Sequence, residues 1–197
     1  MKLLLARAIA LLSAATLSVA CAALSCSIPP ADARYTPSAL PDESTFPPVA
    51  DLLSLRCGAI DCHGTTARNL RIYGSTGLRW LGSDLPFYPV CNTPEEDTQT
   101  YDSVVGLDPE DMSAVASGGD PSLLTMVRKA RGTEDHKGGQ IWTTGDVSDV
   151  CLTSWLHGNP DPGDCKSAVA GAVPLLPAGM TDPLLCCFDG DPSACVP

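Results

Sequence analysis

The stretch T-F-P-P-V-A-D-L-L-S-L-R-C-G-A-I-D-C-H-G, residues 45–64, joins an apolar stripe at helical spacing to two cysteines and a histidine. Its two prolines suit the first turn of a helix. Four apolar residues then recur at helical spacing, namely Val49, Leu52, Leu53 and Leu55. The predicted helix runs directly into Cys57 and Cys62, and a histidine follows the second cysteine. The stretch therefore predicts a helical domain with a chemically distinctive site at the end of its first helix.

The site R-C-G-A-I-D-C-H-G has the order of a covalent haem motif with a longer spacing between its cysteines. In a C-x-x-C-H site the two thiols form thioethers to the haem vinyl groups, and the histidine supplies an imidazole to the iron. Cys62 and His63 meet that requirement, whereas four residues instead of two separate Cys57 from Cys62. The extra residues can be looped out, and Gly58 would ease such a bulge. The alternative is a small disulfide loop between the two cysteines, with His63 as a structural residue.

Three further helices are predicted from capping residues and apolar periodicity. The first begins after Thr93 and ends at Gly106, and the third begins near Asp146 and stops before Gly158. The second lies between Asp120 and Gly132, and its buried face is predicted to hold Leu123, Leu124, Val127 and Ala130. The face predicted for the third holds Val147, Val150, Cys151, Ser154 and Trp155. Strand signals are weak, so the domain is predicted to be mainly α.

Composition divides the chain into four parts. Residues 1–20 have two basic residues ahead of an apolar run and then small residues, which is the pattern of an export signal. Residues 21–45 are rich in Pro, Ser and Ala and predict a flexible tether. Residues 46–160 form the helical domain, and residues 161–197 form a cysteine-rich tail that is predicted to be loop-like and held down by disulfides.

The end of the export signal leaves two outcomes open. Cleavage before Cys21 would allow its lipidation, as in bacterial lipoproteins, and Cys26 offers a weaker second site. Ordinary cleavage nearby would release a soluble secreted product. Either outcome predicts a protein of the bacterial periplasm or cell envelope, with a possible membrane attachment only through the lipidated cysteine.

Cysteine content and net charge indicate which compartment and which classes of partner suit this chain. The chain has 10 cysteines, and in an exported protein such a number indicates an oxidising compartment where disulfides persist. Outside the C-x4-C pair and the N-terminal region, six remain, and the sequence leaves their pairing open: Cys91, Cys151, Cys165, Cys186, Cys187 and Cys195. The net charge of −11 argues against nucleic-acid binding. A nucleophile motif G-x-S-x-G and the second ligand pair of a zinc finger are both missing from the sequence.

The motifs, taken in order, resemble small c-type cytochrome domains. Residues 46–64 look like the first helix and haem motif of such a domain. The run G-G-D-P-S-L-L-T-M-V-R-K-A-R-G-T-E-D-H-K-G-G, residues 118–139, is similar to a segment of the planctomycete-type cytochrome c domains of exported proteins, including myxobacterial lipoprotein relatives. The resemblance covers about residues 46–160 and departs from the family in its C-x4-C spacing.

This resemblance implies a small cytochrome c-like helical domain that carries haem c for electron transfer with a redox partner protein, not an enzyme. Cys57 and Cys62 would attach the haem, and His63 would be the proximal ligand. The distal ligand would come from the loop before the last helix, where His136 stands beside two glycines that let the backbone approach a flat macrocycle. Met126 is the other candidate, although its helical spacing also suits the core.

Further haem contacts are suggested more weakly. Arg68, Arg71 and Arg79 could pair with propionates or lie solvated on the surface. Trp80 and Trp155 could pack on the macrocycle or belong to the core. The competing hypothesis is a haem-free surface lipoprotein, stapled by disulfides, with a binding or structural role.

Overall fold

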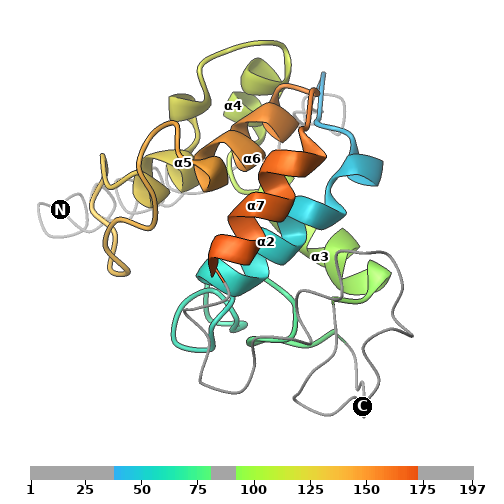
Figure 1. The fold of residues 1–197 in the computed structure, drawn as a ribbon, viewed down its shortest axis with the longest axis vertical. Helices are drawn as coiled ribbons and strands as arrows, with labels where there is room; N and C mark the ends of the chain where they lie inside the picture. Colours follow the sequence, from blue (N-terminus) through green and yellow to red (C-terminus); the bar gives the residue numbers. More distant parts are fainter. Residues whose placement is uncertain (1–37, 81–91, 173–197) are drawn as a thin grey trace, which may run out of the picture. The chain divides into compact units, whose positions relative to one another are not determined.

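The computed structural model describes residues 38–80 and 92–172, which form helices joined by loops (Figure 1). The helices are α2 (Pro47–Cys57), α3 (Pro94–Val105), α4 (Pro109–Ala116), α5 (Thr125–Ala130), α6 (Val147–Leu156) and α7 (Pro162–Ala172), with short 3-10 helices η2 (Glu43–Thr45) and η3 (Pro121–Leu123). Over these residues the β-structure is limited to an isolated bridge between Tyr73 and Leu78. The prediction of a mainly helical fold is confirmed. The predicted export signal, Cys21, Cys26, Cys91 and the last three cysteines of the tail lie outside the described residues.

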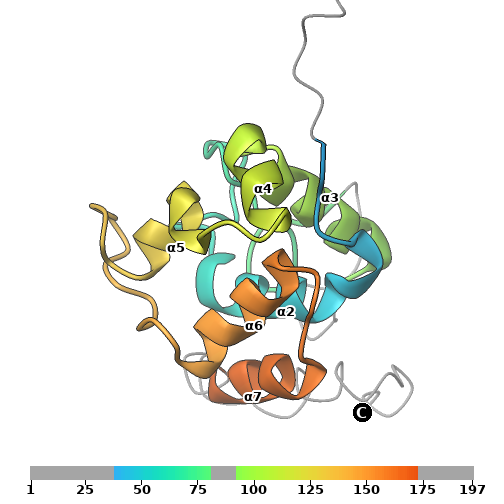
Figure 2. The same ribbon diagram turned by 90° about the horizontal axis from the view of Figure 1, so that it is seen from above.

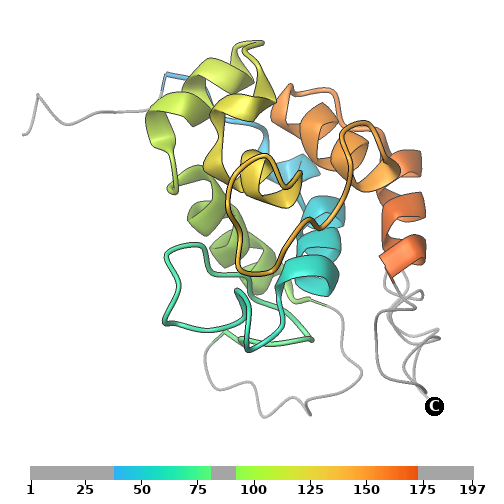
Figure 3. The same cartoon turned by 90° about the vertical axis from the view of Figure 1, so that its left-hand side faces the viewer.

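Helix α2 is the central helix of the core, as its apolar periodicity predicts. Val49, Leu52 and Leu53 are at most 1% exposed. Helices α6 and α7 pack on one side of α2, and α3 and α4 lie on the other (Figures 2 and 3). At the start of α2, the ring of Phe46 packs at 4.7 Å from that of Trp155 in α6. No helix in 38–80 or 92–172 is both long enough and apolar enough to cross a membrane.

The ends of α3 follow the predicted capping signals. The Thr93 side chain accepts a hydrogen bond from the backbone N–H of Glu96, and the Glu96 carboxylate accepts one from the N–H of Thr93. This reciprocal pair is a capping box. Gly106 caps the other end, with its N–H donated to the carbonyl of Asp102. Local sequence therefore sets both ends of this helix.

The second predicted helix is divided in two. It forms η3, and then α5 after an interruption at Leu124, whose backbone is extended (φ −77°, ψ 130°). Asp108 contributes to this break, because its carboxylate accepts a hydrogen bond from the N–H of Thr125 at 2.9 Å. The prediction that Leu123 lies on the buried face is wrong, since it is 42% exposed on η3. Similarly, Val147 in the first turn of α6 is 45% exposed.

The last part of the predicted tether belongs to the folded unit. The backbone carbonyl oxygens of Ala39, Pro41 and Asp42 accept hydrogen bonds from side chains of α4, α3 and α6 respectively. Residues 38–45 are therefore docked on the helices instead of lying free beside them.

The tail prediction is correct in one respect and wrong in another. Cys165 is joined to Cys151, so a disulfide does fasten the start of this region to α6. However, residues 162–172 form α7, which packs on α2 and α6, and are not loop-like. Helix α4 was also not predicted from the sequence. The apolar residues buried from α7 are Ala168, Val169 and Ala172.

Candidate cofactor cleft

The residues after α2 fold back so that the backbone of His63 contacts Cys57, the last residue of the helix. The N–H of His63 donates to the carbonyl of Cys57 at 3.0 Å, which closes the C-x4-C segment into a compact loop. Ala59, Ile60 and Asp61 are exposed, and Ile60 is 58% exposed. The added residues therefore bulge outward.

Gly58 permits this loop by its small size, not by an unusual backbone angle. Its φ is −80°, which any residue adopts. A Cβ on Gly58 would instead lie 2.5 Å from the carbonyl oxygen of Ser54 and 2.9 Å from Oγ1 of Thr76. A Cβ on Gly64 or on Gly77 would likewise clash with the carbonyl oxygen of Gly58. The explanation for Gly58 is therefore close backbone packing between three segments.

His136 lies in the long loop between α5 and α6, which polar contacts hold at several points. The Lys129 ammonium donates to the carbonyl of Asp135 at 2.7 Å. At the far end, the N–H groups of Ile141 and Trp142 donate to the carbonyl of Ala130 at 2.9 and 3.2 Å. In Figure 3 this loop runs beside the end of α2 and the segment that follows it.

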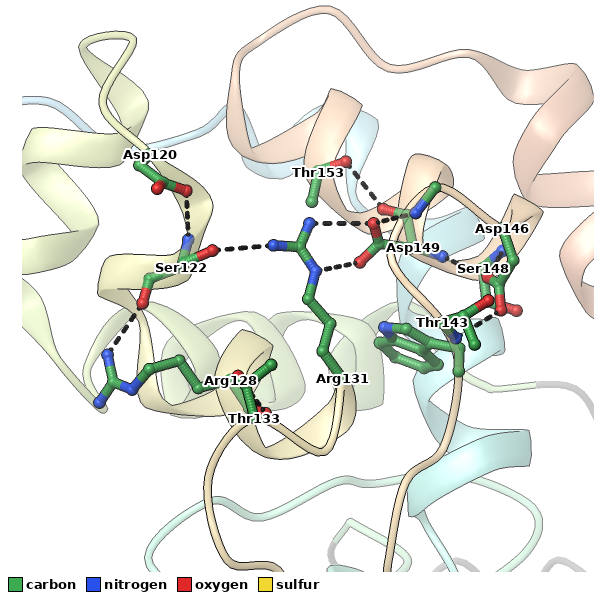
Figure 4. A network of polar contacts seen from close by, with 12 residues as sticks. Asp120, Ser122, Arg128, Arg131, Thr133, Thr143, Asp146, Ser148, Asp149 and Thr153 are labelled. Carbon is green, nitrogen blue, oxygen red and sulfur yellow. Dashed lines mark hydrogen bonds and ion pairs between the residues drawn. The ribbon is translucent and has the colours of Figure 1, made fainter.

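The base of this loop is closed by a buried ion pair (Figure 4). Arg131, at the end of α5, donates through two nitrogens to Asp149 in α6, at 2.8 and 2.9 Å. Asp149 also accepts the N–H of Gly145 at 2.8 Å, and Arg131 reaches the Ser122 hydroxyl at 2.9 Å. The side chains of Arg131 and Asp149 are only 11% and 3% exposed, so the pair fixes how α5 and α6 meet.

The loops bring the imidazoles of His63 and His136 together. Their ring centroids are 6.1 Å apart, and the ring planes differ by 25°. A bond from a metal ion to an imidazole nitrogen is about 2.0–2.1 Å and the centroid lies about 1.1 Å behind that nitrogen, so two imidazoles facing each other across one ion have centroids about 6.2–6.4 Å apart. The observed separation of the two stacked rings, 6.1 Å, is close to this distance.

Both imidazoles are oriented through the same nitrogen. Nδ1 of His63 is 3.0 Å from the carbonyl oxygen of Leu70, and Nδ1 of His136 is 2.9 Å from that of Gly139. A carbonyl oxygen only accepts, so each Nδ1 carries a proton, and Nε2 is the nitrogen that holds the lone pair in the neutral ring. Metal-bound histidines commonly donate their other ring N–H to a backbone carbonyl in this way.

Protonation of His63 is disfavoured. Burial lowers the pKa of His63, and the neighbouring His136 and Arg68 lower it further, although the bond to Leu70 acts in the opposite direction. His63 is therefore kept neutral, which is the form that binds metals.

The two histidines stand where two chambers of one cleft meet. The apolar chamber is about 390 Å³, and its apolar lining includes Leu53, Leu70, Leu107, Met126, Ile141 and Trp142. The charged chamber is about 610 Å³, and its charged lining comprises Arg56, Asp61, Arg68, Lys129, Asp135 and Lys137. Cys57, His63 and His136 line both.

Trp142 gives the apolar chamber a polar group without a protein partner. The side chain is 5% exposed, and its Nε1 has no hydrogen-bond partner among the described residues. A buried indole N–H without a partner is costly, and buried polar groups are normally satisfied. The Trp142 indole N–H is therefore an unpaired donor within the wall of this chamber.

The two sulfurs of the C-x4-C loop are free thiols that are not bonded to each other. Burial raises the pKa of Cys57 to about 12, and the nearby Cys62 raises it further. Burial also raises the pKa of Cys62, with Asp61 acting in the same direction. Neither thiol is suited to act as a thiolate nucleophile at neutral pH.

Of the other residues suggested as haem contacts, Arg68 and Met126 line the cleft and Arg79 does not. Arg68 lines both chambers and donates to the carbonyl of Cys62 at 3.2 Å. Arg79 instead pairs with the buried Glu96 at 2.9 Å. Met126 is buried at 8% exposure in the wall of the apolar chamber, so its core position and its place in the cleft are compatible.

Neither predicted tryptophan lines the cleft. Trp155 is fully buried in the core, and Trp80 packs edge-on against Tyr73. The tryptophan of the cleft is Trp142, which carried no recognisable pattern because it lies in a loop outside both motifs. His157, at the C-terminal end of α6, bonds through Nε2 to the carbonyl of Gly119.

Among the described residues, the two histidines are not joined by a third His, Cys, Asp or Glu side chain that could complete a metal site. In 38–80 and 92–172 there is no group of three or more His, Cys, Asp or Glu residues placed to hold a metal ion. A protein-held zinc ion usually has three or four such ligands. Compared with protein-family models, curated proteins and solved structures, the chain gives no match.

Proposed function

We propose that this protein is an exported c-type cytochrome-like electron carrier that holds one haem in the cleft between His63 and His136. The observation that carries the proposal is the pair of imidazoles. Their ring centroids are 6.1 Å apart, and each ring donates through Nδ1 to a backbone carbonyl, so Nε2 is the nitrogen available to a metal. Two side-chain ligands without a third suit a macrocycle, because a porphyrin supplies the other ligands of its iron.

The walls of the cleft suit an amphipathic prosthetic group. The apolar chamber offers aliphatic and aromatic contacts to the macrocycle. The Arg68 guanidinium supplies donors for propionates, and guanidinium matches carboxylate geometry well. Ligand sites of this kind are mostly apolar with a few placed polar groups.

The C-x4-C thiols support covalent attachment. Cys57 and Cys62 both line the charged chamber beside His63, and both are unbonded, whereas Cys151 and Cys165 are joined. Addition of a thiol across a vinyl group forms a C–S bond and places the thiol proton on the other vinyl carbon. This addition would release nothing and need no oxidant, so Cys57 and Cys62 would hold the haem once the attachment machinery had joined it to them.

When bound, the haem supplies a reversible one-electron step between ferrous and ferric iron. His63 and His136 would hold the iron, and with both bound to it a substrate would find no open site. The buried side chains of Met126 and Trp142 restrict water on the inner side. With two nitrogen ligands the reduction potential would be lower than with Met126 as the distal ligand.

A redox partner protein would approach at the charged chamber. Four bases and two acids line it, although the whole chain has a net charge of −11. Like charges would keep an acidic partner away from the rest of the surface, while the bases would attract it to this rim. Lipidation at Cys21, if it occurs, would keep the carrier at a membrane surface of the cell envelope.

The competing proposal is a haem-free, disulfide-stapled surface lipoprotein. The bond between Cys151 and Cys165 favours a role for disulfides in stability. The free state of Cys57 and Cys62 does not favour the small disulfide loop that this alternative includes.

The test is an absorption spectrum and an intact mass of the full chain, exported by a host with haem-attachment machinery. We expect a Soret band that survives denaturation and a mass gain of one haem. The His63→Ala variant should lose the low-spin spectrum. A colourless protein with a bond between Cys57 and Cys62 would contradict the proposal and support the alternative.

A further inference from the structure

The imidazole of His136 is held by the tight turn H-K-G-G, residues 136–139. The N–H of Gly139 donates to the carbonyl of His136 at 2.9 Å, and Gly139 has a φ of +72°, which glycine adopts without steric penalty. Nδ1 of His136 in turn donates to the carbonyl of Gly139 at 2.9 Å. The side chain is therefore folded back over its own turn, and the turn itself selects the tautomer.

Gly138 lies against the ring of His136. A Cβ built on Gly138 would be 3.1 Å from Cε1 of His136, and 3.5 Å from both Nδ1 and Nε2. The first distance is shorter than ordinary van der Waals contact, so the ring would have to move. The backbone of Gly138 has no positive φ, unlike that of Gly139. Space for the ring, not backbone conformation, therefore favours glycine at position 138.

The backbone of the turn has little freedom to move away. Lys129 fixes the preceding backbone through the carbonyl of Asp135, and its ammonium also pairs with Glu134 at 2.9 Å. A side chain at position 138 would therefore be accommodated by displacing the imidazole, not by moving the whole turn.

We propose that Gly138 is a positioning residue for the distal ligand: by leaving space beneath the imidazole, it sets where Nε2 of His136 lies relative to His63. This inference rests on the proposed function and extends it to the control of iron ligation. It also gives Gly138 a different role from the one expected from the sequence, which was close approach of the backbone to a macrocycle.

The experiment compares three variants of the full exported chain with the wild type. Gly138→Ala places a methyl group against the ring. Gly171→Ala is the matched control, because its Cβ would meet nothing within 4 Å and its φ is not positive. His136→Ala is the reference for complete loss of the ligand. The readouts are the ferric spin state and the affinity of the ferrous protein for carbon monoxide.

Carbon monoxide must take the position that His136 leaves, so its apparent affinity reports the fraction of released ligand. We expect Gly138→Ala to raise this affinity roughly tenfold and to add a high-spin fraction to the ferric spectrum. His136→Ala should show a higher carbon monoxide affinity and a larger high-spin fraction than Gly138→Ala. Gly171→Ala should match the wild type in both.

Two results would overturn the inference in distinguishable ways. If all variants keep haem but Gly138→Ala binds carbon monoxide no better than Gly171→Ala, the positioning role is wrong and the proposed function stands. A lower melting temperature with unchanged affinity leads to the same conclusion. If the wild type carries no haem, the inference and the proposed function both fail.

Discussion

Replacement of Asp149 by alanine tests whether the buried ion pair locks the loop that carries His136. The Asp149 carboxylate accepts two hydrogen bonds from Arg131 and one from the N–H of Gly145, all within 2.9 Å. Its side chain is 3% exposed, so solvent cannot replace these contacts. The variant would leave the guanidinium, which is 11% exposed, without its counter-charge.

The expected cost is large compared with the stability of a small domain. Removing one partner of a buried pair costs about 3–5 kcal/mol, because the other charge remains buried and unpaired. Domains of this size are stable by about 5–15 kcal/mol. The double variant Arg131→Met/Asp149→Leu should cost less than Asp149→Ala, since it removes both charges and leaves apolar groups of similar size.

Urea unfolding followed by circular dichroism measures these costs through linear extrapolation. Glu134→Ala is the control, because the Glu134 pairs with Arg128 and Lys129 are about one-third exposed. Such surface pairs contribute little, so this variant should unfold at the same urea concentration as the wild type. If Asp149→Ala costs no more than Glu134→Ala, or if the double variant is the least stable, the reasoning about the buried pair is wrong.

Three further predictions concern the disulfide, the buried carboxylates and the outward bulge. The bond between Cys151 and Cys165 spans 14 residues, so Cys151→Ala/Cys165→Ala should lower the free energy of unfolding by about 3 kcal/mol; a cost below about 1 kcal/mol would contradict this. Burial, with Asp97 adding to it, raises the pKa of Asp51 to about 8, and burial raises that of Asp97 to about 7. The folded chain then holds protons that the unfolded chain releases, so the free energy of unfolding should fall as the pH rises from about 4 to 8. Asp51→Asn should flatten this fall between pH 5 and 8, and an equally steep fall would refute the assignment. Ile60 is 58% exposed, so Ile60→Ser should change the free energy of unfolding by no more than about 0.5 kcal/mol and leave the haem content unchanged, whereas loss of haem would show that the bulge contacts the cofactor.

The sequence predicted those elements whose signals are local. Capping residues and apolar spacing lie within the segments that became α2, α3 and most of α6, so their ends could be located. The break at Leu124 could not be predicted, because Asp108 lies 17 residues before the N–H of Thr125 that it binds. Helix α7 contains Pro162, Gly163 and Gly171, which favour a loop, and it is held by burial against α2 and α6.

In the cleft, too, the residues with a local sequence signal could be predicted, and those that depend on distant contacts could not. Cys57, Cys62 and His63 are recognisable because their chemistry depends on neighbouring positions, and His136 was found through the resemblance and its adjacent glycines. Trp142 was missed, since its place in the apolar chamber depends on how the loop after α5 returns to Ala130. The pair of Arg131 and Asp149 is 18 residues apart and has no local pattern.

The central claim is that His63 and His136 bind one iron from opposite sides. Near-infrared magnetic circular dichroism of the ferric full-length protein tests it most directly, because the charge-transfer band of low-spin haem depends on the two axial ligands. We predict the band of a haem with two imidazoles, and its loss in His136→Ala. A band characteristic of imidazole and thioether would assign the distal position to Met126, and a protein without haem absorption would contradict the account altogether.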